Sequence, residues 1–384
     1  MTAGSHSTEA LGVYIHWPYC ARICPYCDFN VVRDRGRAEQ KAALMAAILA
    51  DLEVHAALTG PRRLVSIFFG GGTPSLMEPD DVARLISAAR GLWTPADELE
   101  ISLEANPTDA EADRFAGLAE AGVNRLSLGV QSLDDVALRF LGRNHDARAA
   151  RRAIDVATAA FARLSIDLIY ALPGQDLAAW ARELTLVAGL GAEHISPYQL
   201  TIEPGAAFHR RVQRGTLVPI DADRAADFYE TTQSVLERAG FEAYEVSNHA
   251  RSRAARSRHN LIYWRGEDYV GVGPGAHGRL TLAGERFATT APDAIADYVE
   301  TVRRAGAGST RERLVPREVA LERLLMGLRT VEGVALADLA PLAIPVSRLE
   351  ALAPLARHRD GRLLATRAGR PVLDRVIAEL AGGA

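Results

Sequence analysis

The sequence of 384 residues predicts an α/β fold, namely an incomplete (β/α)6 barrel followed by a small helical, winged-helix-like C-terminal domain. Runs rich in β-branched and aromatic residues alternate with Ala-, Leu- and Arg-rich stretches of helical periodicity, which is typical of a parallel sheet with helices outside. A flat doubly wound sheet shows the same alternation and stays the alternative. The expected strands are 12-GVYIH-16, 65-VSIFF-69, 99-LEISLEA-105, 125-RLSLGV-130, 165-SIDLIY-170 and 194-HISPYQL-200.

The segments between these strands have the apolar spacing of amphipathic helices. The clearest are residues 37–58, 109–122 and 146–161, and a further helical stretch, 221–240, follows the last strand. Six strand–helix units fall short of the eight that close a complete barrel, so we expect the barrel to be incomplete.

The C-terminal part has a different pattern. We expect residues 1–305 to form the barrel with its extension and residues 306–384 to form a separate small domain. A helix at 317–329, a short hairpin around 361–369 and a last helix near 370–380 are typical of a winged-helix arrangement.

The bulk composition argues against several classes of protein. The chain is 48% hydrophobic and 24% charged, as in an ordinary globular protein, and its net charge of −4 provides no basic surface for nucleic acid. Residues 1–9 lack the basic and apolar regions of a signal peptide, and no apolar run reaches the roughly 18–20 residues of a membrane span. We therefore expect a cytoplasmic protein that is neither integral to a membrane nor a partner of nucleic acid.

The only cysteines of the chain, Cys20, Cys24 and Cys27, share one loop after the first strand, in the spacing C-x3-C-x2-C. A structural zinc site takes four ligands, usually as two separated pairs, and here only His16 is close enough in sequence to complete one. Three thiolates on a [4Fe–4S] cluster instead leave one iron open for another ligand. The spacing therefore favours an iron–sulfur cluster over zinc.

Other distinctive residues also follow the ends of expected strands. The run 70-GGGTPSL-76 follows the second strand, 104-EANP-107 the third and 129-GVQS-132 the fourth, while Asp167 lies in the fifth. The C-terminal ends of parallel barrel strands share one face, where active sites form. The sequence thus predicts a single site built from all of these segments.

The spacing C-x3-C-x2-C, with an aromatic residue before the last cysteine, resembles the radical S-adenosylmethionine (SAM) superfamily. The resemblance implies a radical SAM barrel in which Cys20, Cys24 and Cys27 hold a [4Fe–4S] cluster and the open iron chelates SAM. It also implies that the glycine run lies against the amino group of SAM, which makes Gly71, Gly72 and Thr73 candidates. A purely structural turn is the alternative for the glycines.

The phrases GVYIHWPYC, FFGGGTPSL, EANP, GVQS, IDLIYALPGQ and SPYQLTIEPG are similar to the branch around oxygen-independent coproporphyrinogen III oxidase. In that branch the matching positions contact one or two SAM molecules. The alternative is that the two carboxylates cap helices and the arginine is a solvated charge. The positions that the resemblance implies are Tyr14, Tyr26, Glu104, Gln131, Arg143 and Asp167.

Two features depart from the oxidase and resemble HemW-type heme chaperones. Phe29 stands where the oxidase has a further cysteine, and a His-Asn-x-x-Tyr-Trp motif places His259, Asn260, Tyr263 and Trp264 together. The resemblance implies that heme is bound with His259 as a contact, since a neutral imidazole is a common axial ligand of heme iron. An ordinary hydrogen-bonded histidine is the alternative.

The leading expectation is therefore a heme chaperone that binds a [4Fe–4S] cluster, SAM and heme and passes heme to an acceptor protein. The alternatives are the oxidase itself, a SAM-dependent methyl or cyclopropane transferase, and a zinc protein without catalysis. Whether the chain is an enzyme or forms a homodimer is open. The basic loop is expected to be solvated, with pairing to heme propionates as the alternative; it holds Arg251, Arg253, Arg256 and Arg258.

Overall fold

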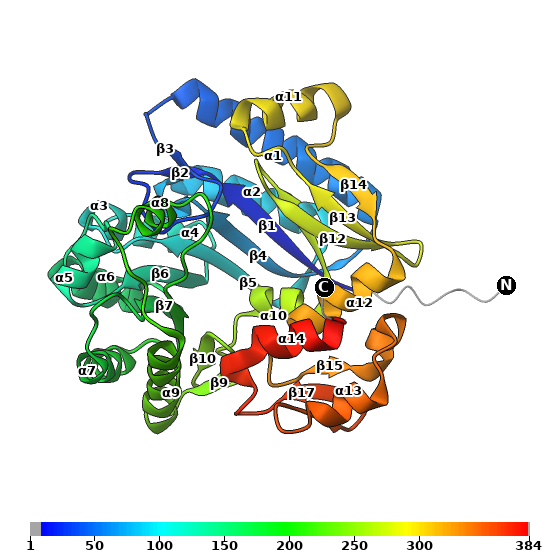
Figure 1. Ribbon diagram of the computed structural model, residues 1–384. Coiled ribbons are helices and arrows are strands. Elements are labelled where there is room, and N and C mark those ends of the chain that lie inside the picture. The colour runs from blue at the N-terminus through cyan, green and yellow to red at the C-terminus, as the bar shows by residue number, and fades with distance from the viewer. Residues whose placement is uncertain (1–8, 383–384) are drawn as a thin grey trace.

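The computed structural model describes residues 9–382, apart from the side chains of residues 109 and 110. Its centre is a parallel sheet whose strands lie side by side in chain order, with helices on the outer face (Figure 1). This confirms the expected α/β fold and its six parallel strands. They are β1 (Ala10–Trp17), β4 (Arg63–Gly71), β5 (Thr94–Ala105), β6 (Arg125–Gln131), β7 (Arg163–Tyr170) and β8 (His194–Gln199).

Of the long connecting helices, α6 (Ala147–Ala160), α7 (Leu177–Ala188) and α9 (Ala222–Arg238) are amphipathic and begin at aspartate side-chain caps. Asp146 and Asp176 each accept a hydrogen bond of 2.7 Å from a backbone N–H in the first turn of the helix that follows. These helices bury their apolar faces against the sheet; for example, Ile154 of α6 is buried. The other long connecting helices are α1 (Ala38–Thr59) and α2 (Pro79–Leu92).

The helix expected over 109–122 is instead two short helices, α3 (Asp109–Ala112) and α4 (Phe115–Glu120). The carboxylate of Glu111 accepts hydrogen bonds from the Asn106 N–H at 2.8 Å and from the Thr108 hydroxyl at 3.1 Å, which ties α3 back to the end of β5. The other short elements of this half are β2 (Tyr19–Cys20), β3 (Val32–Arg33), η1 (Pro74–Leu76), α5 (Asp135–Phe140) and α8 (Ala207–Gln213).

Six further strands extend the sheet to 12, and the sequence reading did not identify them. Strand β11 pairs parallel to β1 and continues into antiparallel strands, while β10 and β9 pair antiparallel beyond β8. The glycine-rich run 271–278 is the end of β11, a turn and the start of β12. The strands and the helices around them are β9 (Glu242–Glu245), β10 (Asn248–Ala250), α10 (Arg258–Arg265), β11 (Asp268–Val272), β12 (His277–Leu282), β13 (Glu285–Thr290), α11 (Ile295–Ala305) and β14 (Thr310–Arg313).

The C-terminal segment has a second hydrophobic core, which includes Leu324, Leu339 and Val376. Its sheet has the order β15-β17-β16, and the sequence of helices and strands is that of a winged helix. The expected boundary at residue 306 falls inside the large sheet, because β14 pairs with β13; the chain leaves that sheet only after Arg313. The elements are α12 (Pro316–Gly327), β15 (Val334–Ala335), η2 (Leu336–Leu342), α13 (Val346–Ala351), β16 (Ala356–Arg359), β17 (Arg362–Ala365), η3 (Arg370–Val372) and α14 (Leu373–Ala381).

Among the residues described, α1 is the one helix long and apolar enough to cross a membrane by length and composition. It packs between α2 and α11 in this fold. Its Asp51 is fully buried and accepts hydrogen bonds from the Tyr298 hydroxyl at 2.9 Å and the Gly308 N–H at 2.7 Å. A carboxylate with protein partners is typical of a core helix.

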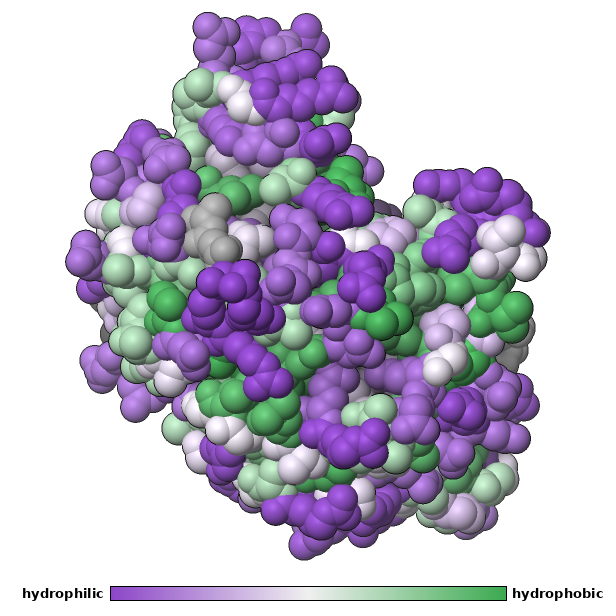
Figure 2. Space-filling view, turned by 90° about the vertical axis from the view of Figure 1, so that its left-hand side faces the viewer, coloured by the Kyte–Doolittle hydropathy of each residue, from purple (hydrophilic) through white to green (hydrophobic). Residues whose placement is uncertain are grey.

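On the molecular face that carries α5 and α7, hydrophilic residues are spread widely among the hydrophobic ones (Figure 2).

Candidate cofactor site

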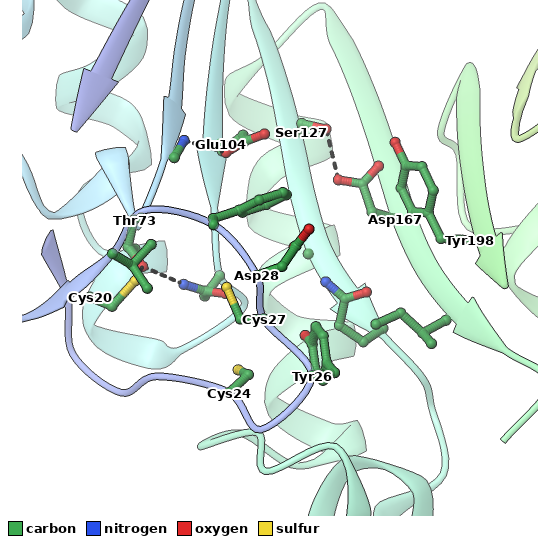
Figure 3. Close-up of a pocket in the computed structure, with 18 of the residues that line it drawn as sticks. Cys20, Cys24, Tyr26, Cys27, Asp28, Thr73, Glu104, Ser127, Asp167 and Tyr198 are labelled. Carbon is green, nitrogen blue, oxygen red and sulfur yellow. Dashed lines mark hydrogen bonds between the residues drawn. The ribbon is translucent and has the colours of Figure 1, made fainter. Parts of the chain in front are cut away.

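A cavity of about 540 Å³ opens at the C-terminal ends of the parallel strands (Figure 3). The cysteine loop forms one wall, and the strand ends form the others. Every residue predicted for the site lines this cavity except Tyr14 and His259. The predicted residues that line it are Cys20, Cys24, Tyr26, Cys27, Gly71, Gly72, Thr73, Glu104, Gln131, Arg143 and Asp167.

The three thiols are free and surround one part of the cavity (Figure 3). The Thr73 hydroxyl donates to Cys20 Sγ over 3.6 Å, and Arg143 Nη1 donates to Cys24 Sγ over 3.4 Å, which are ordinary lengths for hydrogen bonds to sulfur, a weak acceptor. Burial raises the pKa of Cys20 and raises that of Cys27 to about 11. Without a metal the thiols of Cys20 and Cys27 are therefore protonated at neutral pH, and metal binding would release their protons.

The donor set fits a cluster better than a single ion. No group of three His, Cys, Asp or Glu side chains in the described part of the chain lies close enough together to hold one metal ion. In a [4Fe–4S] cluster each thiolate binds a different iron, so the sulfur atoms surround a larger volume than one ion occupies. Three thiols around an open cavity meet that requirement, and they leave one iron without a cysteine.

The cysteine loop is held mainly at its ends. Asn30 Nδ2 donates to the carbonyl of Pro274 at 3.0 Å and to that of Asp293 at 2.8 Å, and His16 Nε2 lies 2.8 Å from the Asn30 carbonyl. In the middle of the loop, the carbonyl of Pro25 accepts from the Phe208 N–H at 2.8 Å. The residues between these points keep their side chains directed at the cavity or at solvent.

The glycine run is explained by close approach of the backbone. A Cβ on Gly72 would lie 2.7 Å from the carbonyl carbon of Pro18, and the Gly72 N–H donates to the Trp17 carbonyl at 2.8 Å. Gly71 has a φ of 106°, which favours glycine, and its N–H donates to Glu104 Oε2 at 3.1 Å. The run thus packs against the end of β1, and its residues Gly71, Gly72 and Thr73 line the cavity.

Two carboxylates face the cavity from neighbouring parts of the sheet. Burial and the nearby Asp167 raise the pKa of Glu104 to about 7, and burial also raises the pKa of Asp167. The hydroxyls of Ser127 and Ser165 donate to Asp167 at 2.8 Å and 3.2 Å (Figure 3). These partners are strand residues, so neither carboxylate caps a helix. Both are available to receive donors from a ligand.

Arg143 is buried in a network and is not a solvated helix-end charge. It donates to Cys24 Sγ, the Tyr26 hydroxyl, Asn106 Oδ1 and the Gly129 carbonyl. The network fixes one wall of the cavity beside the cysteines.

Gln131 sits at an irregularity in the pairing of β6 and β7 with a φ of 66°. Its Oε1 is buried without a hydrogen-bond partner among the described residues. Because a buried acceptor without a partner is costly, a ligand donor at this position would stabilise the site.

His259 lies behind the cavity lining and is only 1% exposed. Its Nδ1 is 2.8 Å from Ser66 Oγ and its Nε2 is 2.6 Å from the Tyr263 hydroxyl. The ring stacks 4.9 Å from that of Phe68, and burial lowers the pKa of His259 to about 3. Asn260, the next residue, does line the cavity. Heme contact by His259 stays a prediction, and it requires the ring to leave these partners.

Tyr14 also lies behind the lining, stacked on Phe68 with its hydroxyl 2.9 Å from His16 Nδ1. Sequence reasoning missed several residues that line the cavity, among them Ser127 and Arg329. Ser127 is inside a strand, where alternate residues face the barrel interior, and that periodicity is the signal that was available. Arg329 comes from the C-terminal domain, and no local pattern indicates its position.

Comparisons with known proteins agree with this geometry. The radical SAM superfamily matches residues 14–187. Radical S-adenosyl methionine domain-containing protein 1, mitochondrial, of Bos taurus is 43% identical over 338 residues, which cover 85% of this chain and 75% of the relative. Heme chaperone HemW of Escherichia coli is 39% identical over 281 residues, 73% of each chain. Heme chaperone HemW of Mycobacterium tuberculosis is 35% identical over 379 residues, 97% of this chain and 95% of the relative.

Among solved structures, coproporphyrinogen III oxidase (HemN) from Escherichia coli, described as a radical SAM enzyme, matches with a TM-score of 0.81 at 21% identity. The match covers 99% of this chain and 92% of that one, so it supports the fold of the C-terminal domain as well as that of the barrel. Membership of the superfamily implies a [4Fe–4S] cluster and SAM as cofactors. The chain belongs to the radical SAM superfamily and, within it, to the family of the HemW heme chaperones.

Proposed function

We propose that this protein is a heme chaperone that holds a [4Fe–4S] cluster, SAM and heme and delivers heme to an acceptor protein. The HemW relatives are named for this activity. The observation that carries the proposal is the shared cavity, which is lined both by the three thiols and by Asn260 of the His-Asn-x-x-Tyr-Trp motif. Cofactor and heme-related motifs that are far apart in sequence therefore face one space.

In this proposal Cys20, Cys24 and Cys27 hold the cluster, which when bound supplies an electron for the reductive cleavage of SAM. The polar groups around the thiols position SAM: the hydroxyl of Thr73 and the edge of the glycine run on one side, and the carboxylates on the other. Arg143 fixes the wall beside Cys24. The remaining proposed SAM contacts are Tyr14, Tyr26, Gly71, Gly72, Glu104, Gln131 and Asp167.

The test is an anaerobic heme titration of the cluster-loaded protein, followed by mixing with an apo-hemoprotein. We expect saturable binding in the Soret absorbance and then transfer of the heme to the acceptor. The Cys24→Ala variant shows whether binding depends on the cluster. Absence of saturable heme binding by the cluster-loaded wild-type protein would refute the proposal.

The same preparation tests the enzymatic alternative. Incubation with coproporphyrinogen III, SAM and a reductant should yield no stoichiometric protoporphyrinogen, because Phe29 occupies the position of a cysteine that the resembled oxidases carry. Stoichiometric product would replace the chaperone by the oxidase. A cytoplasmic location and a homodimer stay predictions, and the bovine relative is named as mitochondrial.

A further inference from the structure

Two arginines line the same cavity far from the cysteine loop. Arg125 is the first residue of β6, so it lies toward the end of the barrel opposite to the strand ends that carry the thiols. Arg329 follows α12 and reaches the cavity from the C-terminal domain. We call the part of the cavity lined by Arg125 and Arg329 the arginine end.

Arg125 is buried, with 2% of its surface exposed, and its Nε has no hydrogen-bond partner among the described residues. The charge of Arg125 acts to lower the pKa of the buried carboxylates Glu100 and Asp167, so both lie near it. Each of them already has close hydrogen-bond donors, because Glu100 pairs with Arg163 at 2.7 Å and Asp167 accepts from two serine hydroxyls. A buried guanidinium nitrogen without a hydrogen bond is costly, because it has lost water without gaining an acceptor. What the Nε of Arg125 lacks is such an acceptor, and a carboxylate of a ligand would provide one.

Arg329 is held in a fixed orientation. Its Nε and Nη2 donate to Glu245 Oε1 at 2.8 Å and 2.7 Å, and its guanidinium lies 5.0 Å from the centre of the Trp264 ring. Glu245 is fully buried, and its other oxygen accepts from the Ser247 N–H and from Asn248 Nδ2. In the described part of the chain Nη1 of Arg329 has no partner. A guanidinium oriented in this way loses little entropy when it binds an anion.

We propose that Arg125 and Arg329 bind carboxylate groups of the ligand, so that the ligand enters the cavity with its carboxylate-bearing edge at the arginine end. The inference rests on the proposed function in that heme is the ligand, with two propionates to offer. Of the loop arginines that were the alternative for this role, Arg251 and Arg258 are engaged elsewhere. Arg251 donates to three backbone carbonyls, and Arg258 pairs with Glu98.

The test compares binding of heme with binding of heme dimethyl ester, which lacks the carboxylate charges. Arg125→Met and the double variant Arg329→Met/Glu245→Gln each remove one site; the second substitution in the double variant avoids leaving Glu245 buried and unpaired. Arg258→Gln is the matched control, because it removes an arginine charge outside the cavity. Iron content and far-ultraviolet circular dichroism establish that each variant is folded and loaded.

We expect the wild-type protein and Arg258→Gln to bind heme about 10- to 100-fold more tightly than the ester, as a charge-assisted hydrogen bond provides. Each cavity variant should lose about tenfold in heme affinity and little in ester affinity. Equal binding of heme and ester by the wild-type protein would overturn this inference alone. Failure of the wild-type protein to bind heme at all would overturn the proposed function and the inference with it.

Discussion

The cysteine loop and helix α10 are two walls of one cavity, and they are built in opposite ways. In the loop, the Sγ atoms of Cys24 and Cys20 accept hydrogen bonds of 3.4 Å and 3.6 Å, which are weak because sulfur is a weak acceptor, and Phe29 is 61% exposed. In α10, both ring nitrogens of His259 have close partners and the ring is 1% exposed. The loop is held at a few points, whereas α10 buries His259 and Ile262 against the sheet.

This difference shows that residues of a sequence motif can have two roles: some hold a cofactor, and others stabilise the fold around it. Groups that hold a cofactor stay without strong partners until the cofactor arrives, because a satisfied group has little to gain from a ligand. Groups that are satisfied inside the fold contribute to its stability and to the shape of the wall. In this conformation the cysteines belong to the first kind and His259 to the second, so substitutions in the two walls should have different effects.

The largest effect should come from Cys24→Ala, which removes one of three cluster ligands. We expect cluster content, measured as iron and acid-labile sulfide after anaerobic reconstitution, to fall close to zero. The free energy of unfolding of the cofactor-free protein should change by less than about 1 kcal/mol, because the thiol is partly exposed and packs little.

Ile23→Ala is the matched control for this loop, since Ile23 lines the same cavity and is 47% exposed but has no group that could bind iron. It should keep a full cluster. A normal iron and sulfide content in Cys24→Ala would contradict the assignment of the ligands. The cysteine loop would then not differ from α10 as the wall that holds the cofactor.

The second effect concerns the other wall. His259→Ala should lower the free energy of unfolding by about 2–4 kcal/mol, because it opens a cavity and leaves the hydroxyls of Ser66 and Tyr263 without their partner. Cluster content should be unchanged. Urea denaturation of the cofactor-free protein measures the loss, and the exposed His358→Ala variant should stay within about 0.5 kcal/mol of wild type.

A pH series sharpens the His259 comparison. Burial lowers the pKa of His259 to about 3 in the folded protein, whereas an unfolded histidine has a pKa near 6.5. Between these values the unfolded state binds a proton that the folded state excludes, so the free energy of unfolding falls as the pH falls through this window. His259→Ala should reduce that slope by up to about 1.4 kcal/mol per pH unit. An unchanged slope would show that the imidazole is not buried in its neutral form.

Glu104→Gln should change the free energy of unfolding less than His259→Ala does, and it should raise it. With the pKa of Glu104 raised to about 7, the folded state keeps a proton between pH 4.5 and 7 that the unfolded state releases, so stability falls as the pH rises through this window. The glutamine carries no charge and can still accept from the Gly71 N–H. At pH 8 the free energy of unfolding of the cofactor-free variant should therefore be about 1–3 kcal/mol higher than that of the wild-type protein.

At pH 4 the same Glu104→Gln variant and the wild-type protein should be equally stable. Glu120 is on the exposed surface, so the free energy of unfolding of Glu120→Gln should equal that of the wild-type protein at both pH 4 and pH 8. If Glu104→Gln were equally stable with wild type at both pH values, the carboxylate would be as well solvated as one on the surface.

The sequence predicted the parallel strands well, because each is a continuous apolar run bounded by turn residues. It also predicted that segments around Cys20, Gly71 and Glu104 meet, because parallel strand ends share a face. The antiparallel strands after residue 240 were missed, since they are short and carry charged residues at the edge, as in β14. Their pairing is decided by partners distant in the chain.

The environment of a side chain was the least predictable part of the site. The resemblance to HemW-type chaperones implies heme contact by His259, but nothing local indicates that Ser66, 193 residues away in the chain, engages the ring. Arg329 gave no signal for the same reason, because its role depends on docking of the C-terminal domain beside the barrel. Motif reading identified which elements surround the cavity, and tertiary packing decided which of their atoms face it.

The smallest effect should come from Asn30→Ala, which tests how the loop is held. The substitution removes the two hydrogen bonds to Pro274 and Asp293, so we expect a loss of only about 1 kcal/mol in the free energy of unfolding. Because these bonds anchor the loop that carries the thiols, the cluster should release iron to a chelator about fivefold faster. Asn124→Ala is the matched control, since Asn124 also bonds two backbone groups, Ile101 N–H and the Leu99 carbonyl, but on the sheet. Equal iron release in the two variants would mean that the cluster itself, and not the anchor at Asn30, holds the loop in place.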